Sequence, residues 1–174
     1  MTTTSSAPPD DRTEPPYEGD ERATLEGFLD FHRETLLWKC AGLTPEQLRL
    51  RPIPSTNLSL LGLVRHLAAV ERSWFREDVA GEDVPSLYYT REEPDRDIDP
   101  PADADPEADL VAFRAEVEAC RAVVRDRDLD STFVTPRGRT ISLRWLFVHM
   151  IEEYARHNGH ADLIRQAIDG ATGE

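Results

Sequence analysis

Three polar residues interrupt an apolar stripe near the C-terminus, and their types are those that bind metals. The stripe consists of positions spaced alternately three and four residues apart: Leu143, Leu146, Met150, Glu153, His157, His160 and Ile164. Such spacing keeps side chains on one buried face of a helix. Burying an unpaired carboxylate is costly. A divalent cation would remove that cost, because it prefers carboxylate oxygen and imidazole nitrogen at about 2 Å.

A further histidine in an apolar stripe supplies a third ligand. In the segment before Gly81, the stripe is Ser59, Leu63, His66, Val70 and Ser73. Glu153 and His157 are spaced i, i+4 and can chelate one ion, and His66 can reach it from a facing helix. The sequence therefore predicts a metal on His66, Glu153 and His157. The coordination positions left open for water or substrate are typical of a catalytic site.

Other roles remain open for some of these residues. His66 alone could be a core histidine with satisfied hydrogen bonds, and Glu153 alone could pair with Arg156 or Arg65. A di-iron site is disfavoured, because that type of bundle needs a second Glu-x-x-His helix and more carboxylates.

Three more histidines have less defined roles. His160 could be a group beside the ligands, a general acid or base near the open site, or a wall of the pocket. His149 and Glu152 lie off the stripe, which favours a solvated or helix-stabilising role. His32 lies on the apolar face of the first helix and is expected in the core or in a pocket.

Four helix-length segments must position these residues. The periodicity predicts helices over about 21–40, 58–79, 106–127 and 142–168, with a short turn opened by Thr44-Pro45-Glu46. Residues 1–20 are expected to form a disordered acidic, proline-rich tail, and residues 21–170 one domain. Residues 81–106 form a long acidic linker, which either covers a site or is a solvated crossover. No segment alternates over strand length, so the expected fold is an all-α four-helix bundle with a long acidic crossover loop.

Composition excludes several classes of function. The net charge of −14 argues against nucleic acid, because a phosphate backbone would be repelled. No apolar run is long enough for a membrane span, and no signal peptide is apparent, so the chain is expected to be cytoplasmic. Cys40 and Cys120 have no partner spacing and are expected to be buried thiols. Basic residues are arginine except Lys39, which suggests a GC-rich bacterial genome.

Two stretches of sequence resemble the DinB/YfiT-like superfamily, most closely its mycothiol transferase branch. They are Gly62-Leu63-Val64-Arg65-His66-Leu67 with the following Val70–Phe75, and the stretch His149–Asp162, whose segment His157-Asn158-Gly159-His160-Ala161-Asp162 is fairly specific. The resemblance covers about residues 22–168. It implies an up-down-down-up bundle and a metal held by three side chains, with Glu153 standing where many members have histidine. The family often forms homodimers, which the sequence itself neither supports nor excludes.

The expected function is that of a metal-dependent thiol S-transferase. Zn²⁺ is the first choice of metal and Ni²⁺ the second, and the thiol cosubstrate implied by the resemblance and the GC-rich composition is mycothiol. The metal would activate the thiol for attack on an electrophilic small molecule, with His160 as the candidate catalytic neighbour. The alternatives are a metal-dependent hydrolase or isomerase, and a non-catalytic metal-binding protein of the stress response.

Overall fold

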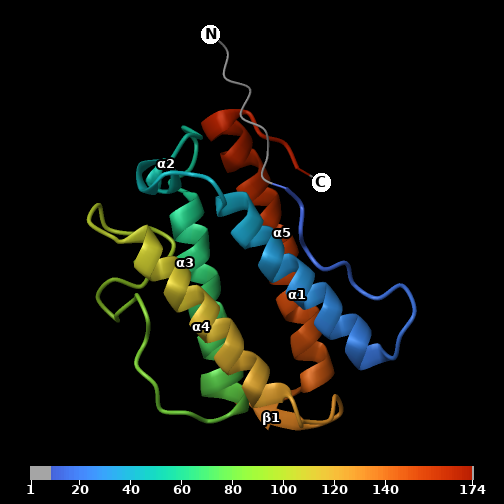
Figure 1. Cartoon of the computed structure of the whole chain (residues 1–174). Helices are drawn as coiled ribbons and strands as arrows, with labels where there is room; N and C mark the ends of the chain where they lie inside the picture. The colour runs from blue at the N-terminus through green and yellow to red at the C-terminus, as the bar shows by residue number, and fades with distance from the viewer. Residues whose placement is uncertain (1–8, 174) are drawn as a thin grey trace.

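The computed structural model describes residues 9–173, and its long helices form a bundle (Figure 1). In chain order the elements are α1 (Glu21–Cys40), α2 (Pro45–Arg49), α3 (Leu60–Glu71), η1 (Arg72–Val79), α4 (Pro106–Val124), β1 (Thr132–Val134), β2 (Thr140–Ser142) and α5 (Leu143–Asp169). The predicted four-helix bundle is thereby confirmed.

The bundle has the up-down-down-up order. Figure 1 shows α1 and α5 running in one direction, and α3 and α4 running in the other. Because consecutive helices α3 and α4 are parallel, the chain between them must return along the whole length of the bundle. Residues 80–105 make that return without a helix or strand. The long acidic crossover loop is therefore a requirement of the topology.

Hydrogen-bonding caps fix where the helices begin. Asp20, Thr44, Ser59, Asp105 and Ser142 each accept a hydrogen bond from a backbone amide in the first turn of the helix that follows. Such caps satisfy amides that have no partner inside the helix. The cap of α2 is reciprocal: Thr44 and Gln47 form the capping box, with proline at the first helical position.

Two elements differ from the prediction. A short antiparallel hairpin, β1–β2, pairs Phe133 with Ile141 just before α5. Each strand has only three residues, too few for alternation to be recognised in the sequence. The predicted second helix is also not uniformly α-helical, because its C-terminal part, η1, is a π-helix. π-helical turns are rare and occur often at functional sites.

A charged network lies inside the otherwise apolar core. Glu71, at the junction of α3 and η1, has no exposed surface. Its carboxylate accepts hydrogen bonds from the Arg33 guanidinium of α1 and the Tyr154 hydroxyl of α5. Burial and the nearby carboxylate raise the pKa of Tyr154 above its usual value, so its hydroxyl keeps the proton that it donates. The network ties three helices of the bundle together.

The N-terminal segment that the structure describes, residues 9–20, has no helix or strand and lies against α1. The Arg12 guanidinium lies over the rings of Phe31 and Trp38, 4.6 Å from each centroid, and it donates to the Thr35 hydroxyl. These contacts give part of the predicted tail a defined position, which its composition does not reveal. The remainder, residues 1–8, lies outside the described residues. Within the described part of the chain, no helix is both long and apolar enough to cross a membrane.

Candidate metal centre

Glu153 and His157 lie one turn apart on α5 and face the inside of the bundle. Their side chains are 18% and 12% exposed, and His157 Nε2 lies 3.6 Å from Glu153 Oε2. Two ligand atoms bound to one tetrahedral zinc ion at about 2.1 Å would lie roughly 3.4 Å apart. The separation of this pair is therefore close to that of two chelating atoms.

His66 approaches the same place from α3. Its ring centroid is 4.9 Å from that of His157, with the ring planes at 68°. Its Nδ1 lies 2.8 Å from Oδ2 of Asp97, which belongs to the crossover loop. The crossover loop thus contacts the candidate site through Asp97.

His160 extends the histidine group by one more turn of α5. Its ring centroid is 5.5 Å from that of His157. Among the described residues, the Nδ1 atoms of both His157 and His160 are buried without a hydrogen-bond partner. Unpartnered buried nitrogens are uncommon in native proteins. They fit a site that binds a further group.

Burial, and after it the neighbouring His66 and His160, lower the pKa of His157 to about 4. The imidazole of His157 is therefore neutral near pH 7. A neutral imidazole is the form that binds a metal. The donor set and its protonation both suit a divalent cation.

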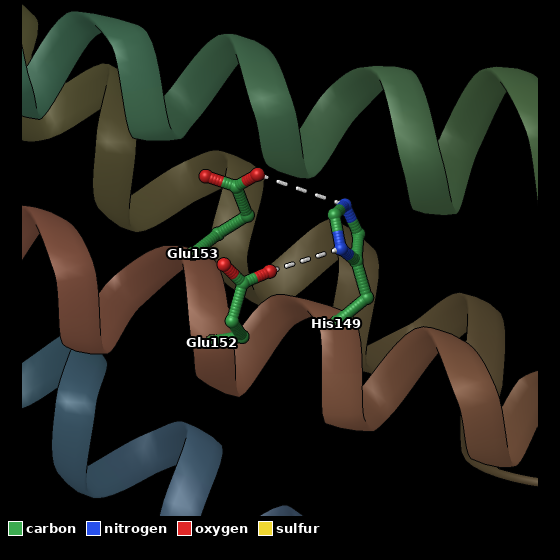
Figure 2. A group of neighbouring side chains, drawn as sticks. All are labelled: His149, Glu152 and Glu153. Atoms are coloured by element: carbon green, nitrogen blue, oxygen red, sulfur yellow. Dashed lines mark ion pairs between the residues drawn. The ribbon is translucent and has the colours of Figure 1, made fainter.

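The tightest group of potential ligands is nevertheless a different one. Among residues 9–173, the only three or more His, Cys, Asp or Glu side chains whose ligand atoms all lie within 4.8 Å of one another are His149, Glu152 and Glu153 (Figure 2). His149 Nδ1 is 3.5 Å from Glu152 Oε2, and its Nε2 is 3.8 Å from Glu153 Oε1. Glu153 thus lies between His149 and His157. In the predicted set, only Glu153 and His157 have ligand atoms close together, and the His66 ring faces His157 from α3. This set is less compact than the cluster of His149, Glu152 and Glu153.

His149 is also less solvated than its place off the stripe predicts. Its side chain is 20% exposed, and its ring stacks on Trp145 at 4.9 Å and 17°. The Trp74 ring of η1 meets it edge-on at 5.0 Å. Burial lowers the pKa of His149. His149 is thus not solvated, because Trp74 of the π-helix covers this face of α5. Its contacts with Glu152 and Glu153, one turn along α5, fit the helix-stabilising role that the sequence also allowed.

A cavity of about 1010 Å³ opens beside these aromatic rings. Its walls come from η1, the hairpin and the start of α5: Ser73, Trp74, Glu77, Asp78, Thr135, Pro136, Arg137, Arg139, Thr140, Ile141, Ser142, Trp145 and His149. His149 is shared between this cavity and the carboxylate of Glu153. The cavity therefore ends next to the candidate ligands and has the size of a small-molecule site.

The other polar residues that the sequence singles out have structural partners. Glu153 lies 3.5 Å from Arg156, as its alternative role required, whereas Arg65 pairs with Asp109. His32 is half-buried, and the Asn158 side chain donates to its backbone carbonyl. Burial lowers the pKa of His32.

Both cysteine thiols are buried and protonated. Cys40 and Cys120 are free and buried. Burial raises the pKa of Cys40 to about 12 and that of Cys120 well above its usual value. The expectation of ordinary buried thiols is confirmed for both. Neither can supply a thiolate near neutral pH.

Structural comparison identifies the same fold in proteins of low sequence identity. A conserved protein from Enterococcus faecalis is 16% identical with a TM-score of 0.61, covering 88% of this chain and 99% of that one. YfiT from Bacillus subtilis, described as a probable metal-dependent hydrolase with an unusual four-helix bundle topology, is 16% identical with a TM-score of 0.60, covering 89% and 93%. A mutant of mycothiol-dependent maleylpyruvate isomerase is 14% identical with a TM-score of 0.55, covering 78% of this chain and 59% of that one.

Sequence comparison gives the family. No curated protein sequence matches this chain. The family model described as mycothiol S-transferase matches residues 24–170, which include all of the bundle's helices except the first three residues of α1, and all the candidate ligands. The resemblance inferred from the two histidine-containing stretches is confirmed, and the chain belongs to the mycothiol S-transferase family.

Proposed function

We propose that this chain is a metal-dependent thiol S-transferase, with one divalent cation, Zn²⁺ before Ni²⁺, held by His66, Glu153 and His157. The observation that carries the proposal is the convergence of three donors from two helices: the His66 and His157 rings at 4.9 Å, and Glu153 at 3.6 Å from His157. Membership of the mycothiol S-transferase family supports mycothiol as the thiol. The second substrate is an electrophilic small molecule.

A cation at this position would lower the pKa of a thiol and so supply a nucleophilic sulfur near neutral pH. The transfer then forms a bond between sulfur and an electrophilic carbon, while a leaving group departs with its electron pair. The thiol proton must also be removed. His160 lies one turn beyond His157 with an unpartnered Nδ1, so it is placed to accept that proton.

The remaining residues of the site would bind and orient the substrates. The cavity beside Trp74, Trp145 and His149 offers aromatic faces for an organic ring, and its wall residue His149 lies 3.8 Å from Glu153. Stacking on such faces both orients a ligand and excludes water from it. The electrophile is expected to bind there.

Metal analysis of the purified full chain tests the ligand set. We expect about one equivalent of divalent ion per chain, and loss of tight binding in His66→Ala and in His157→Ala. Glu153→Gln should weaken binding much more than it weakens folding, because an uncharged amide is easier to bury. His149→Ala is the matched control, since it removes a neighbouring histidine of α5 outside the proposed set.

Two results would contradict the proposal. Full metal occupancy in both His66→Ala and His157→Ala would exclude the site, and loss confined to His149→Ala would move it to the cluster of Figure 2. The activity is tested on the metal-loaded protein with mycothiol and a panel of alkyl and aryl electrophiles. Bound metal without conjugation, but with ester or amide hydrolysis, would favour a hydrolase. Bound metal without either reaction would favour a metal-binding protein.

A further inference from the structure

The crossover loop lies directly on the turn of α3 that carries His66. Asp97 is 7% exposed, and its Oδ2 lies 2.8 Å from His66 Nδ1. The next residue, Ile98, packs its backbone against Gly62, one turn before His66 on the same face of α3. A Cβ at position 62 would lie 3.2 Å from the Ile98 carbonyl carbon and would overlap its oxygen. Only glycine lets the loop come this close.

Arg65 holds the loop on the other side of Asp97. Its guanidinium donates to the backbone carbonyl of Arg96 at 3.3 Å and lies 3.9 Å from the ring centroid of Tyr88. It also pairs with Asp109 in the first turn of α4 at 3.0 Å. The stretch around Asp97 is therefore attached to α3 and α4 by contacts that do not involve His66.

The chemistry of the Asp97 side chain decides the direction of this hydrogen bond. A carboxylate has only acceptor atoms, and Oδ2 of Asp97 lies 2.8 Å from Nδ1 of His66. Nδ1 of His66 must then carry the proton, which leaves the Nε2 lone pair of a neutral ring free for a ligand.

We infer that Asp97 is a positioning residue for His66, and that Gly62 and Arg65 hold the crossover loop where Asp97 can fix the tautomer and the orientation of the His66 ring. The inference rests on the proposed function, because it assigns His66 Nε2 as the metal ligand. A carboxylate on the far nitrogen of a ligating histidine also makes the ligand more basic. The loop that the topology requires is thereby part of the site.

Zinc affinity is one measure of this role. In Asp97→Ala the ring loses its fixed tautomer, and the affinity for Zn²⁺, measured against a chromophoric chelator, should fall about 10-fold to 100-fold. Asp97→Asn keeps an acceptor for Nδ1–H without the charge, so its loss should be smaller. The stability of the metal-free protein should change little in either variant, because Arg65 and Gly62 still hold the loop.

Two glycine variants test whether the position of the crossover loop matters for zinc binding when the Asp97 side chain is unchanged. Gly62→Ala forces the loop away while Asp97 itself is intact, and it should weaken zinc binding in the same direction as Asp97→Ala. The control is Gly159→Ala on α5, where an added Cβ meets nothing within 4 Å. Both replacements improve helix propensity. The control should bind zinc as the unmodified chain does.

The tautomer of His66 is measured independently of any metal, by ¹⁵N NMR of the histidine rings in the metal-free protein. The inference expects the Nδ1-protonated form in the unmodified chain and a mixed or reversed population in Asp97→Ala. It is overturned if Asp97→Ala keeps both that tautomer and its zinc affinity while His66→Ala loses zinc. Normal zinc binding by His66→Ala would instead refute the metal site. In that case an unchanged tautomer in Asp97→Ala would refute the positioning of His66 as well, and a changed one would support it.

Discussion

The Arg33 guanidinium donates two hydrogen bonds, of 2.7 and 2.8 Å, to the two carboxylate oxygens of Glu71. Arg33 is 5% exposed and Glu71 is fully buried, so the pair connects α1 to the end of α3 without solvent. Glu71 lies five residues after His66, at the point where the α-helix becomes a π-helix. The pair thereby fixes the end of α3 relative to α1, close to the candidate metal centre.

Removing one member of this pair should destabilise the protein strongly. Arg33→Met leaves the Glu71 carboxylate buried with only the Tyr154 hydroxyl as a partner, and we expect a loss of about 3–5 kcal/mol in the free energy of unfolding. Chemical denaturation measures it. The double variant Arg33→Met with Glu71→Leu should recover part of the loss, because it leaves no buried charge. A single variant as stable as the unmodified chain would contradict the role of the pair.

The stability of the metal-free protein should depend on His157 in acid. Its pKa is about 4 in the folded chain against an ordinary 6.5, so between these values the unfolded chain binds a proton that the folded chain does not. The free energy of unfolding should therefore fall as the pH is lowered from about 6.5 to about 4. His157→Gln should remove this contribution and flatten the curve. Parallel curves for the two proteins would exclude a buried neutral imidazole at position 157.

His160→Ala should retain most of the metal and lose much of the turnover. His160 lies about 4.5 Å along the helix axis from His157, and its ring is better placed to touch the thiol or the substrate than the ion. Metal content and rate are measured on one preparation. Loss of metal would make His160 a ligand, and normal turnover would make it a wall of the pocket.

Trp145→Ala should raise KM for the electrophile more than it lowers kcat. The indole of Trp145 is 48% exposed on the cavity wall, and a stacked ring contributes on the order of 0.5–1.5 kcal/mol, which corresponds to about a twofold to tenfold rise in KM. Val148→Ala, an exposed residue of α5 outside the cavity, is the control. Equal effects of the two replacements would place the electrophile elsewhere.

Helix periodicity and capping residues were enough to predict the bundle, because each long helix has a largely apolar stripe and a local start signal such as Ser59. The π-helix has no such signal in the sequence. It begins directly after Glu71, which is bound by Arg33 from another helix. Asp97 could not be found either. It lies 31 residues from His66 in a proline-rich loop, and only the length of that loop suggested a role in covering a site.

The buried thiols have a consequence under the proposed function, in which the chain binds an electrophile. Soft electrophiles alkylate thiolates and free amines. Cys40 and Cys120 are both enclosed and protonated, and the chain's sole lysine, Lys39, is 4% exposed and paired with Asp162. The thiols and the lysine amine, which a soft electrophile would attack first, are therefore buried. Under the proposed function, an electrophile would therefore react with the small thiol in preference to these three side chains.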